Sequence, residues 1–277
     1  MRFAIGTSDS SLGVFNEFIR AGWEPVQLFC VPAQGGLDGN HKVIELAQSK
    51  HIKVQLSRMT EADLLDLAKC GCDALVVADY KWRIGDWRPH LKYAVNFHPS
   101  PLPEARGPYP MVRAILENRK SWAVSCHQLA PDFDTGDIMA AETFGLNDSE
   151  CHESLNLKIQ MASCRLANRV ANNFSALWDR ATPQGPGDYW PNPAEEDQTI
   201  NFSNPVDLVM RQIRAFGLMG CLAHVSGVSI YVRRAVAWKE IHSHPVGEVA
   251  HVDNKTIVVA VSDGYIGIIE WSIAPTI

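Results

Sequence analysis

Apolar residues in the first half of the chain alternate between short continuous runs and stretches with helical spacing. Runs typical of buried parallel strands lie at about 2–7, 25–31, 53–57, 73–79 and 93–98. Helical periodicity separates them at Ser10–Ala21, His41–Lys50 and Glu61–Cys70, and a helix near 108–118 precedes a strand near 122–129. This alternation predicts an α/β fold, with a Rossmann-like, mostly parallel sheet and flanking helices.

The pattern changes after about residue 178. Pro, Gly and Asn are frequent from Trp178 to Pro205, and an amphipathic helix follows at Val206–Phe216. Short alternating strands come next, separated by turns at Ser226-Gly227, Asp253-Asn254 and Ser262-Asp263-Gly264. We therefore expect an N-terminal domain at 1–180, a linker at 181–204 and a small OB-like β-barrel domain at 205–277.

Composition narrows the class of protein. With 277 residues and 46% hydrophobic residues, the chain can bury a sizeable core, and no run approaches the ~18 apolar residues of a membrane span. The first residues lead directly into a strand pattern without a signal-peptide cleavage region, so we expect a cytoplasmic protein. Seven scattered cysteines fit buried free thiols in a reducing compartment. The formal net charge is −6, so the composition shows no excess of basic residues that would favour binding to nucleic acid.

Candidate chemistry is concentrated between residues 96 and 137. Asn96 and His98 are two positions apart at the end of a predicted strand, so their side chains point to the same face. In open α/β sheets, ligands bind beyond that end of the strands. Asp134 follows the next predicted strand, within Asp132-Phe133-Asp134-Thr135-Gly136-Asp137. An amide, an imidazole and a carboxylate in one cleft can hold a carbonyl oxygen and move a proton.

Simpler interpretations exist for the same residues. His98 alone could be an ordinary core histidine, and a carboxylate in the 132–137 turn could only bond nearby backbone, which suits Asp132 and Asp137 better than Asp134. The histidines near Pro245 lack cysteine or carboxylate partners, so we expect no metal site. Gly6-Thr7-Ser8 lacks the spacing of a nucleotide-phosphate loop.

The combined motifs resemble the folate-dependent formyltransferase family, which includes methionyl-tRNA formyltransferase, glycinamide ribonucleotide formyltransferase and the sugar-nucleotide N-formyltransferases. The shared pattern is Asn-x-His, a Ser-x-Leu-Pro loop, Arg-Gly and Asp-x-Gly-Asp. Here it reads Asn96 and His98, Ser100–Pro103, Arg106-Gly107 and Asp134–Asp137. Similarity extends to Gly6-Thr7, to residues 73–78, and to Ile213–Phe216 in the second domain, so it covers nearly the whole chain.

The resemblance implies that 10-formyltetrahydrofolate donates a formyl group to a primary amine. Asn96, and His98 when protonated, would then stabilise the tetrahedral oxyanion, and Asp134 would favour the imidazolium and accept the amine's proton. The resemblance places His127 in a supporting or packing role. By position in the family pattern, the pterin should lie against the backbone of two segments, with these candidate binding residues: Tyr80, Trp82, Ile84, Ala130 and Asp132.

The acceptor is less defined than the donor. The resemblance implies that family members acting on tRNA have a basic insertion after the second strand. The corresponding loop in this chain, Pro32–Asn40, has no Lys or Arg. From Trp190 onward, nine Asp and Glu face six Lys and Arg. These regions have too few basic residues to balance the negative charge of a polyanion such as tRNA. We therefore expect the acceptor to be a small amine, such as a nucleotide-linked amino sugar or an ornithine-like amine.

Three alternatives stay open besides that function. Methionyl-tRNA is the second choice of acceptor. A formyltetrahydrofolate hydrolase would use the same three residues, but the resemblance implies that hydrolases of this family carry an added N-terminal regulatory domain. A non-catalytic folate-binding module would not need the Asn96, His98 and Asp134 set. The C-terminal domain could shape the acceptor side or form a homodimer contact.

Overall fold

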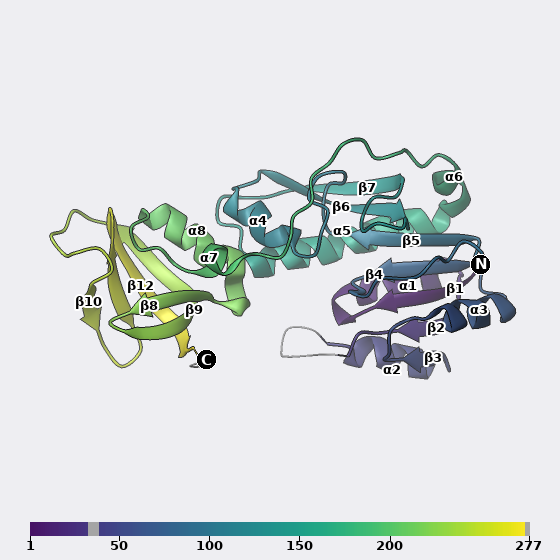
Figure 1. Cartoon of the computed structure of the whole chain (residues 1–277), viewed down its shortest axis with the longest axis horizontal. Helices are drawn as coiled ribbons and strands as arrows, with labels where there is room; N and C mark the ends of the chain where they lie inside the picture. Colours follow the sequence, from purple (N-terminus) through teal and green to yellow (C-terminus); the bar gives the residue numbers. More distant parts are fainter. Residues whose placement is uncertain (33–38, 275–277) are drawn as a thin grey trace. The chain divides into compact units, whose positions relative to one another are not determined.

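The computed structural model describes residues 1–32 and 39–274, and its larger sheet has the strand order β3-β2-β1-β4-β5-β6-β7 (Figure 1). Its strands are β1 (Arg2–Thr7), β2 (Glu24–Phe29), β3 (Lys53–Gln55), β4 (Ala74–Ala78), β5 (Tyr93–His98), β6 (Ser121–Gln128) and β7 (Ile138–Gly145). β1 to β5 pair in parallel, whereas β6 runs antiparallel to β5. The carboxyl ends of β1, β4 and β5 therefore meet at one edge of the sheet.

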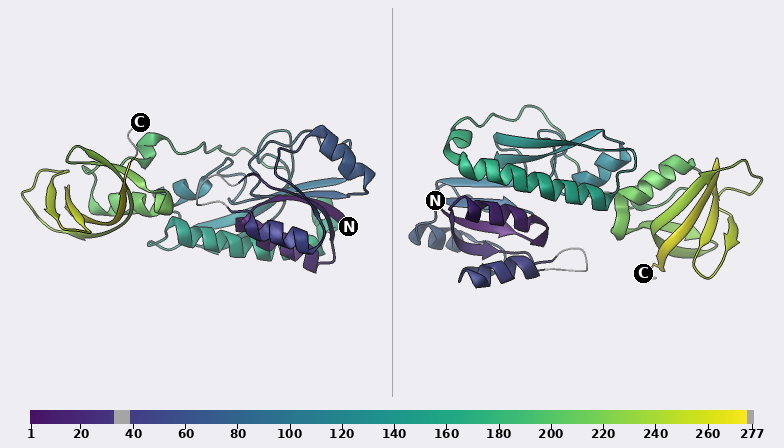
Figure 2. Two further views of the ribbon diagram at one scale, coloured as in Figure 1. Left: turned by 90° about the horizontal axis from the view of Figure 1, so that it is seen from below. Right: turned by 180° about the vertical axis from the view of Figure 1, so that it is seen from behind.

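Helices cover both faces of this sheet. The helices along this part of the chain are α1 (Leu12–Arg20), α2 (His41–Ser49), α3 (Glu61–Lys69), α4 (Pro110–Leu116), α5 (His152–Asn172) and α6 (Phe174–Asp179), with a 3₁₀ turn η1 (Asp9–Ser11) before α1. Figure 2 shows α1 and α5 on the same side of the sheet. On the opposite face, Leu64 and Leu67 of α3 pack with Leu75 and Val77 of β4. Burial of these apolar side chains fixes the strand edge on which the polar residues lie.

The C-terminal part contains a five-stranded antiparallel sheet with the order β10-β11-β12-β9-β8. Its elements are α7 (Glu195–Gln198), α8 (Val206–Phe216), the 3₁₀ turn η2 (Gly217–Met219), β8 (Cys221–Val225), β9 (Val228–Lys239), β10 (Val249–Val252), β11 (Ile257–Val261) and β12 (Gly264–Ile273). Ser226 and Gly227 both have positive φ and join β8 to β9, as a two-residue hairpin turn requires. Both parts of the predicted fold class, the mostly parallel sheet and the small antiparallel domain, are confirmed.

Contacts divide the chain into two compact units. The first contains Met1–Pro108, Ser121–Phe144 and Lys158–Trp190, and the second contains Tyr109–Lys120, Gly145–Leu157 and Pro191–Ile277. The predicted domain bounds at 180 and 205 stay a prediction. Residues 182–190, which we expected in a linker, belong by their contacts to the first unit.

Two further expectations concern sequence outside these elements. Residues 33–38 of the loop Pro32–Asn40, which has no Lys or Arg, lie outside the described residues. Within the ranges that are described, no helix is both long enough and apolar enough to cross a membrane.

The turn between β6 and β7 depends on a close backbone approach at Gly136. A Cβ atom at this position would lie 1.8 Å from the carbonyl oxygen of Gln128, and that residue's N–H donates to Asp137 O at 2.9 Å. No side chain fits there without moving backbone. Gly136 therefore lets the chain turn tightly just after Asp134.

We expect Gly136→Ala to lower the free energy of unfolding by about 2 kcal/mol, since the added methyl group overpacks this turn. Urea unfolding, monitored by tryptophan fluorescence, measures the change in the free energy of unfolding. Gly85→Ala is the matched control, because a Cβ at Gly85 has nothing described within 4 Å. Equal stabilities for the two variants would contradict this account of Gly136.

Candidate active site

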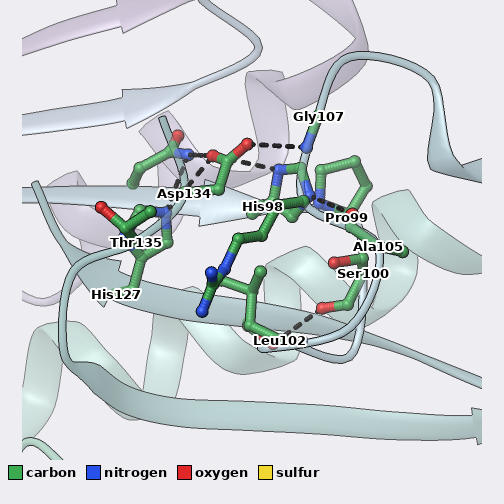
Figure 3. A network of polar contacts seen from close by, with 12 residues as sticks. His98, Pro99, Ser100, Leu102, Ala105, Gly107, His127, Asp134 and Thr135 are labelled. Carbon is green, nitrogen blue, oxygen red and sulfur yellow. Dashed lines mark hydrogen bonds and ion pairs between the residues drawn. The ribbon is translucent and has the colours of Figure 1, made fainter. Parts of the chain in front are cut away.

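The polar set predicted from the sequence comes together at the carboxyl end of β5 (Figure 3). Asn96 and His98 project from this strand, and Asp134 lies in the turn between β6 and β7. Asp134 Oδ1 is 3.3 Å from Asn96 Nδ2 and 3.3 Å from His98 Nδ1. Both contacts converge on one carboxylate oxygen, so the strand alternation that placed the two side chains on one face holds in the structure.

Backbone conformation aims the Asp134 carboxylate at this strand. Asp134 has φ +57°, a left-handed conformation that is uncommon for residues other than glycine. Its second oxygen, Oδ2, accepts a hydrogen bond from the N–H of Gly107 at 3.0 Å. Each carboxylate oxygen therefore has partners, and the side chain is held between the turn that follows β6 and the loop that follows β5.

His98 is buried and its two ring nitrogens face different acceptors. Nε2 donates to the carbonyl oxygen of Ala105 at 3.0 Å, and Nδ1 faces Asp134. Burial lowers the pKa of His98 below its ordinary value, and the Asp134 carboxylate only partly opposes this effect. Asp134 thus favours the imidazolium, as we expected, but burial has the larger effect and favours the neutral ring.

Asp134 keeps its charge although it is largely buried. Burial would raise the pKa of its carboxyl group, but the contact with His127, the electrostatic interaction with His98 and the hydrogen bond from the N–H of Gly107 outweigh burial. The pKa of Asp134 consequently lies below its ordinary value. A charged acceptor thus lies beside a neutral imidazole, an arrangement that can receive one proton.

His127 supports this arrangement from β6. Its ring Nδ1 donates to Gln128 O at 2.8 Å, which leaves Nε2 as an acceptor for Asn96 Nδ2 at 3.2 Å. The side chain is almost completely buried. His127 therefore orients the Asn96 amide, in line with the supporting role that the resemblance implied.

The residues predicted to bind folate lie on two neighbouring segments. Tyr80 follows β4 directly, is buried, and accepts a hydrogen bond from Met59 N through its hydroxyl oxygen at 2.9 Å. Trp82 and Ile84 are partly buried against the same apolar cluster. The Tyr80 side chain is thus held within the fold, while Trp82 and Ile84 stay partly exposed.

Arg83 joins that segment to the second one. Its guanidinium donates to Pro131 O at 2.6 Å and lies 3.5 Å from an oxygen of the exposed Asp132. Ala130, partly buried, belongs to the same turn and lies beside these contacts in sequence. The structure thus links the two predicted segments, while their role toward a pterin stays a prediction.

Other features of the described residues do not share this chemistry. No group of three or more His, Cys, Asp or Glu side chains among residues 1–32 and 39–274 is arranged to hold a metal ion. A surface cavity of about 370 Å³ lies where β4 and β5 begin, lined by residues that include Gly71, Asp73 and Lys92. That cavity is at the opposite end of the strands from Asp134.

The site contains residues that the sequence did not point to. The carbonyl of Ala105 fixes the orientation of His98, and Gln184 and Asp188 contact the backbone of Asp134 and Ala105. Gly107, in contrast, could be found from the sequence, because it belongs to the Arg-Gly motif. Nothing in the sequence marked Gln184 or Asp188, because a Pro- and Gly-rich stretch indicates only turns.

Two family matches cover most of the chain. Residues 33–170 match the family described as formyl transferase, and residues 194–274 match the formyl transferase C-terminal domain. The chain is 26% identical over 218 residues to a methionyl-tRNA formyltransferase of Anaplasma marginale, covering 78% of this chain and 69% of that protein. It is 36% identical over 124 residues to the Treponema denticola enzyme of the same name, covering 44% and 38%. The alignments to the first five such relatives span 38–69% of their lengths.

Solved structures share the fold over the whole chain. An N-formyltransferase from Helicobacter canadensis, solved with folinic acid and dTDP-3-aminofucose, superimposes with a TM-score of 0.71 at 16% identity, covering 98% of this chain and 99% of that one. HypX from Aquifex aeolicus, solved with tetrahydrofolic acid, gives 0.72 at 17% identity, covering 99% and 44%. With both family matches and this fold, the chain belongs to the formyltransferase family of enzymes.

Proposed function

We propose that this protein transfers a formyl group from 10-formyltetrahydrofolate to the primary amine of a small molecule, such as a nucleotide-linked amino sugar or an ornithine-like amine. The observation that carries the proposal is the convergence of Asn96 and His98 on one oxygen of Asp134. The folate compounds bound in the Helicobacter canadensis and Aquifex aeolicus proteins support the choice of donor.

The proposed reaction uses these side chains in two ways. When the amine nitrogen bonds to the formyl carbon, the carbonyl electrons move to oxygen. The Asn96 amide then exchanges one of its two N–H bonds, to His127 Nε2 or Asp134 Oδ1, for a hydrogen bond to that oxyanion. The amine's proton passes to the His98 and Asp134 pair, where the imidazolium that forms is stabilised by the adjacent carboxylate. The bond from carbon to the folate nitrogen then breaks, and that nitrogen takes up a proton as the carbonyl re-forms.

Charge pairing in the C-terminal part supports a small acceptor. Arg214 donates to the carbonyls of Glu150 and Asp148, and Lys239 lies 2.6 Å from a carboxylate oxygen of Asp207. Arg234 lies 3.9 Å from Glu270. Basic side chains beside carboxylates, such as Lys239 and Arg234, displace fewer of a polyanion's counterions, so they add less affinity for tRNA.

Methionyl-tRNA formyl transfer is the second candidate. The observation that favours it is the name shared by the curated relatives, at 26% and 36% identity for the first two. Hydrolysis of the donor by water would use the same catalytic set, and a folate-binding module would need none of it. Product analysis separates these possibilities.

We expect Asn96→Ala, His98→Ala and Asp134→Ala each to lower turnover by at least about 100-fold, because each group acts mainly in the transition state. Release of tetrahydrofolate in the presence of the amine acceptor measures the rate, and circular dichroism checks folding. The double variant of His98 and Asp134 should be little worse than the poorer single variant, since the two act together. Asp66→Ala, on the exposed face of α3, is the control. Near wild-type turnover in Asp134→Ala would remove Asp134 from the mechanism.

The pH dependence follows from the lowered pKa of His98. The neutral ring receives the amine's proton, so activity should be lost as pH falls through a pKa below 6.5. NMR titration of the imidazole, assigned by comparison with His98→Gln, should find His98 more than half neutral at pH 6.5. Asp134→Asn should lower the pKa further, because it removes the carboxylate that raises it. A His98 that is mostly protonated at pH 6.5 would contradict this account.

The acceptor is tested by incubating the purified protein with 10-formyltetrahydrofolate and, separately, dTDP-linked amino sugars, ornithine and initiator methionyl-tRNA. We expect an N-formylated small amine by mass spectrometry, and weak tRNA binding with little salt dependence. Efficient formylation of the tRNA, with affinity that falls steeply as salt rises, would instead assign the tRNA function.

A further inference from the structure

The segment 182–190 is hydrogen-bonded to the chain after Asp134 and to the loop after His98. Thr182 pairs with Ile138 at the start of β7 through N–H to carbonyl bonds of 2.8 and 2.9 Å. Farther along, Arg106 N donates to Asp188 O at 3.1 Å, and Trp190 N donates to Arg106 O at 2.6 Å. One end of the segment thus contacts the strand after Asp134, and the other contacts the loop after His98.

Glycines allow the backbones to approach this closely. A Cβ at Gly187 would lie 2.1 Å from the carbonyl oxygen of Pro103, and a Cβ at Gly107 would lie 2.1 Å from that of Trp190. Gly107 is also the residue whose N–H binds Asp134 Oδ2. The segment therefore lies directly against the loop that orients the catalytic carboxylate.

Gln184 connects the two loops through its side chain. Its amide nitrogen donates to the carbonyl oxygens of Asp134 at 2.8 Å and Gly136 at 2.6 Å. Its amide oxygen accepts from Arg106 Nε at 3.1 Å and from an Arg106 terminal nitrogen at 2.9 Å. One of these contacts satisfies the carbonyl of the left-handed Asp134, and the other three hold Gly136 and Arg106, which lie in the two loops around the set.

Asp188 acts on the other loop. Its Oδ1 accepts the N–H of Ala105 at 2.9 Å, and its Oδ2 accepts the indole N–H of Trp190. Ala105 has φ +58°, and its carbonyl oxygen accepts a hydrogen bond from the N–H at His98 Nε2. The Asp188 side chain therefore holds the peptide before Ala105, and its backbone carbonyl accepts Arg106 N–H from the next peptide, whose carbonyl bonds His98 Nε2.

We propose that Gln184 and Asp188 are positioning residues, which act through the 105–107 and 134–136 backbone to keep His98 and the Asp134 carboxylate in reactive geometry. The proposal rests on the function proposed above. Its physical basis is that a misplacement of about 1 Å in a catalytic group can cost about 100-fold in rate. The segment is thus part of the active site although it contacts no reacting atom.

Gln184→Met tests this role, because it keeps the side-chain length and removes both the donor and the acceptor. We expect kcat to fall about 10-fold or more, with KM for 10-formyltetrahydrofolate within about threefold of wild type. Gln184→Glu should be impaired as well, since it keeps the volume and the acceptor for Arg106 but loses the donors to Asp134 O and Gly136 O. Gln198→Met is the matched control, because Gln198 donates a similar bond to Gly220 O at 2.7 Å in the second unit.

A second measurement does not depend on activity. NMR titration should show a lower pKa for His98 in Gln184→Met than in wild type, because the carboxylate that supports the imidazolium is no longer held in place. Gln198→Met should leave the titration unchanged. If the wild type transfers no formyl group to any amine, the proposed function fails, and the His98 titration still decides the positioning role. Unchanged kcat and an unchanged His98 titration in both Gln184 variants would overturn the proposal.

Discussion

The buried carboxylate of Asp134 is the group on which the rest of the site depends. An ionised carboxylate that is 9% exposed is stable only when hydrogen bonds replace the lost water. The Asn96 amide and the Gly107 N–H provide such bonds, and the His98 ring lies beside them. Because those donors come from β5 and the loop after it, holding the charge also brings the proposed catalytic side chains together.

The backbone around this carboxylate adopts conformations that the surrounding chain must stabilise. Asp134 and Ala105 both have positive φ, which costs on the order of 1 kcal/mol or more for residues with a side chain. The carbonyl of Asp134 and the N–H of Ala105 are both satisfied by side chains of the segment 182–190. Left-handed residues near the proposed chemistry therefore depend on contacts that come from a distant part of the sequence.

Sequence reasoning reached part of this arrangement. Strand alternation predicted that Asn96 and His98 share a face, and helical spacing predicted α8 at Val206–Phe216. The position of Asp134 after a predicted strand made it a candidate, and the family resemblance then gave it a role. β7 and α5 were not predicted, although Leu155, Ile159 and Leu166 are buried at helical spacing. The contacts of Gln184 and Asp188 could not be predicted, because composition does not tell which carbonyls a turn segment meets. The folate-binding residues and domain bounds stay predictions.

The central claim is that the pair of His98 and Asp134 takes the proton of an attacking amine during formyl transfer. The most direct measurement uses 10-formyltetrahydrofolate labelled with ¹³C in the formyl group, a mixture of small amines and tRNA, and mass spectrometry of all products. The account predicts label in an N-formylated small amine with the wild type, and about 100-fold less with Asp134→Ala. Label that appears only as free formate, or equal transfer by the two proteins, would contradict it.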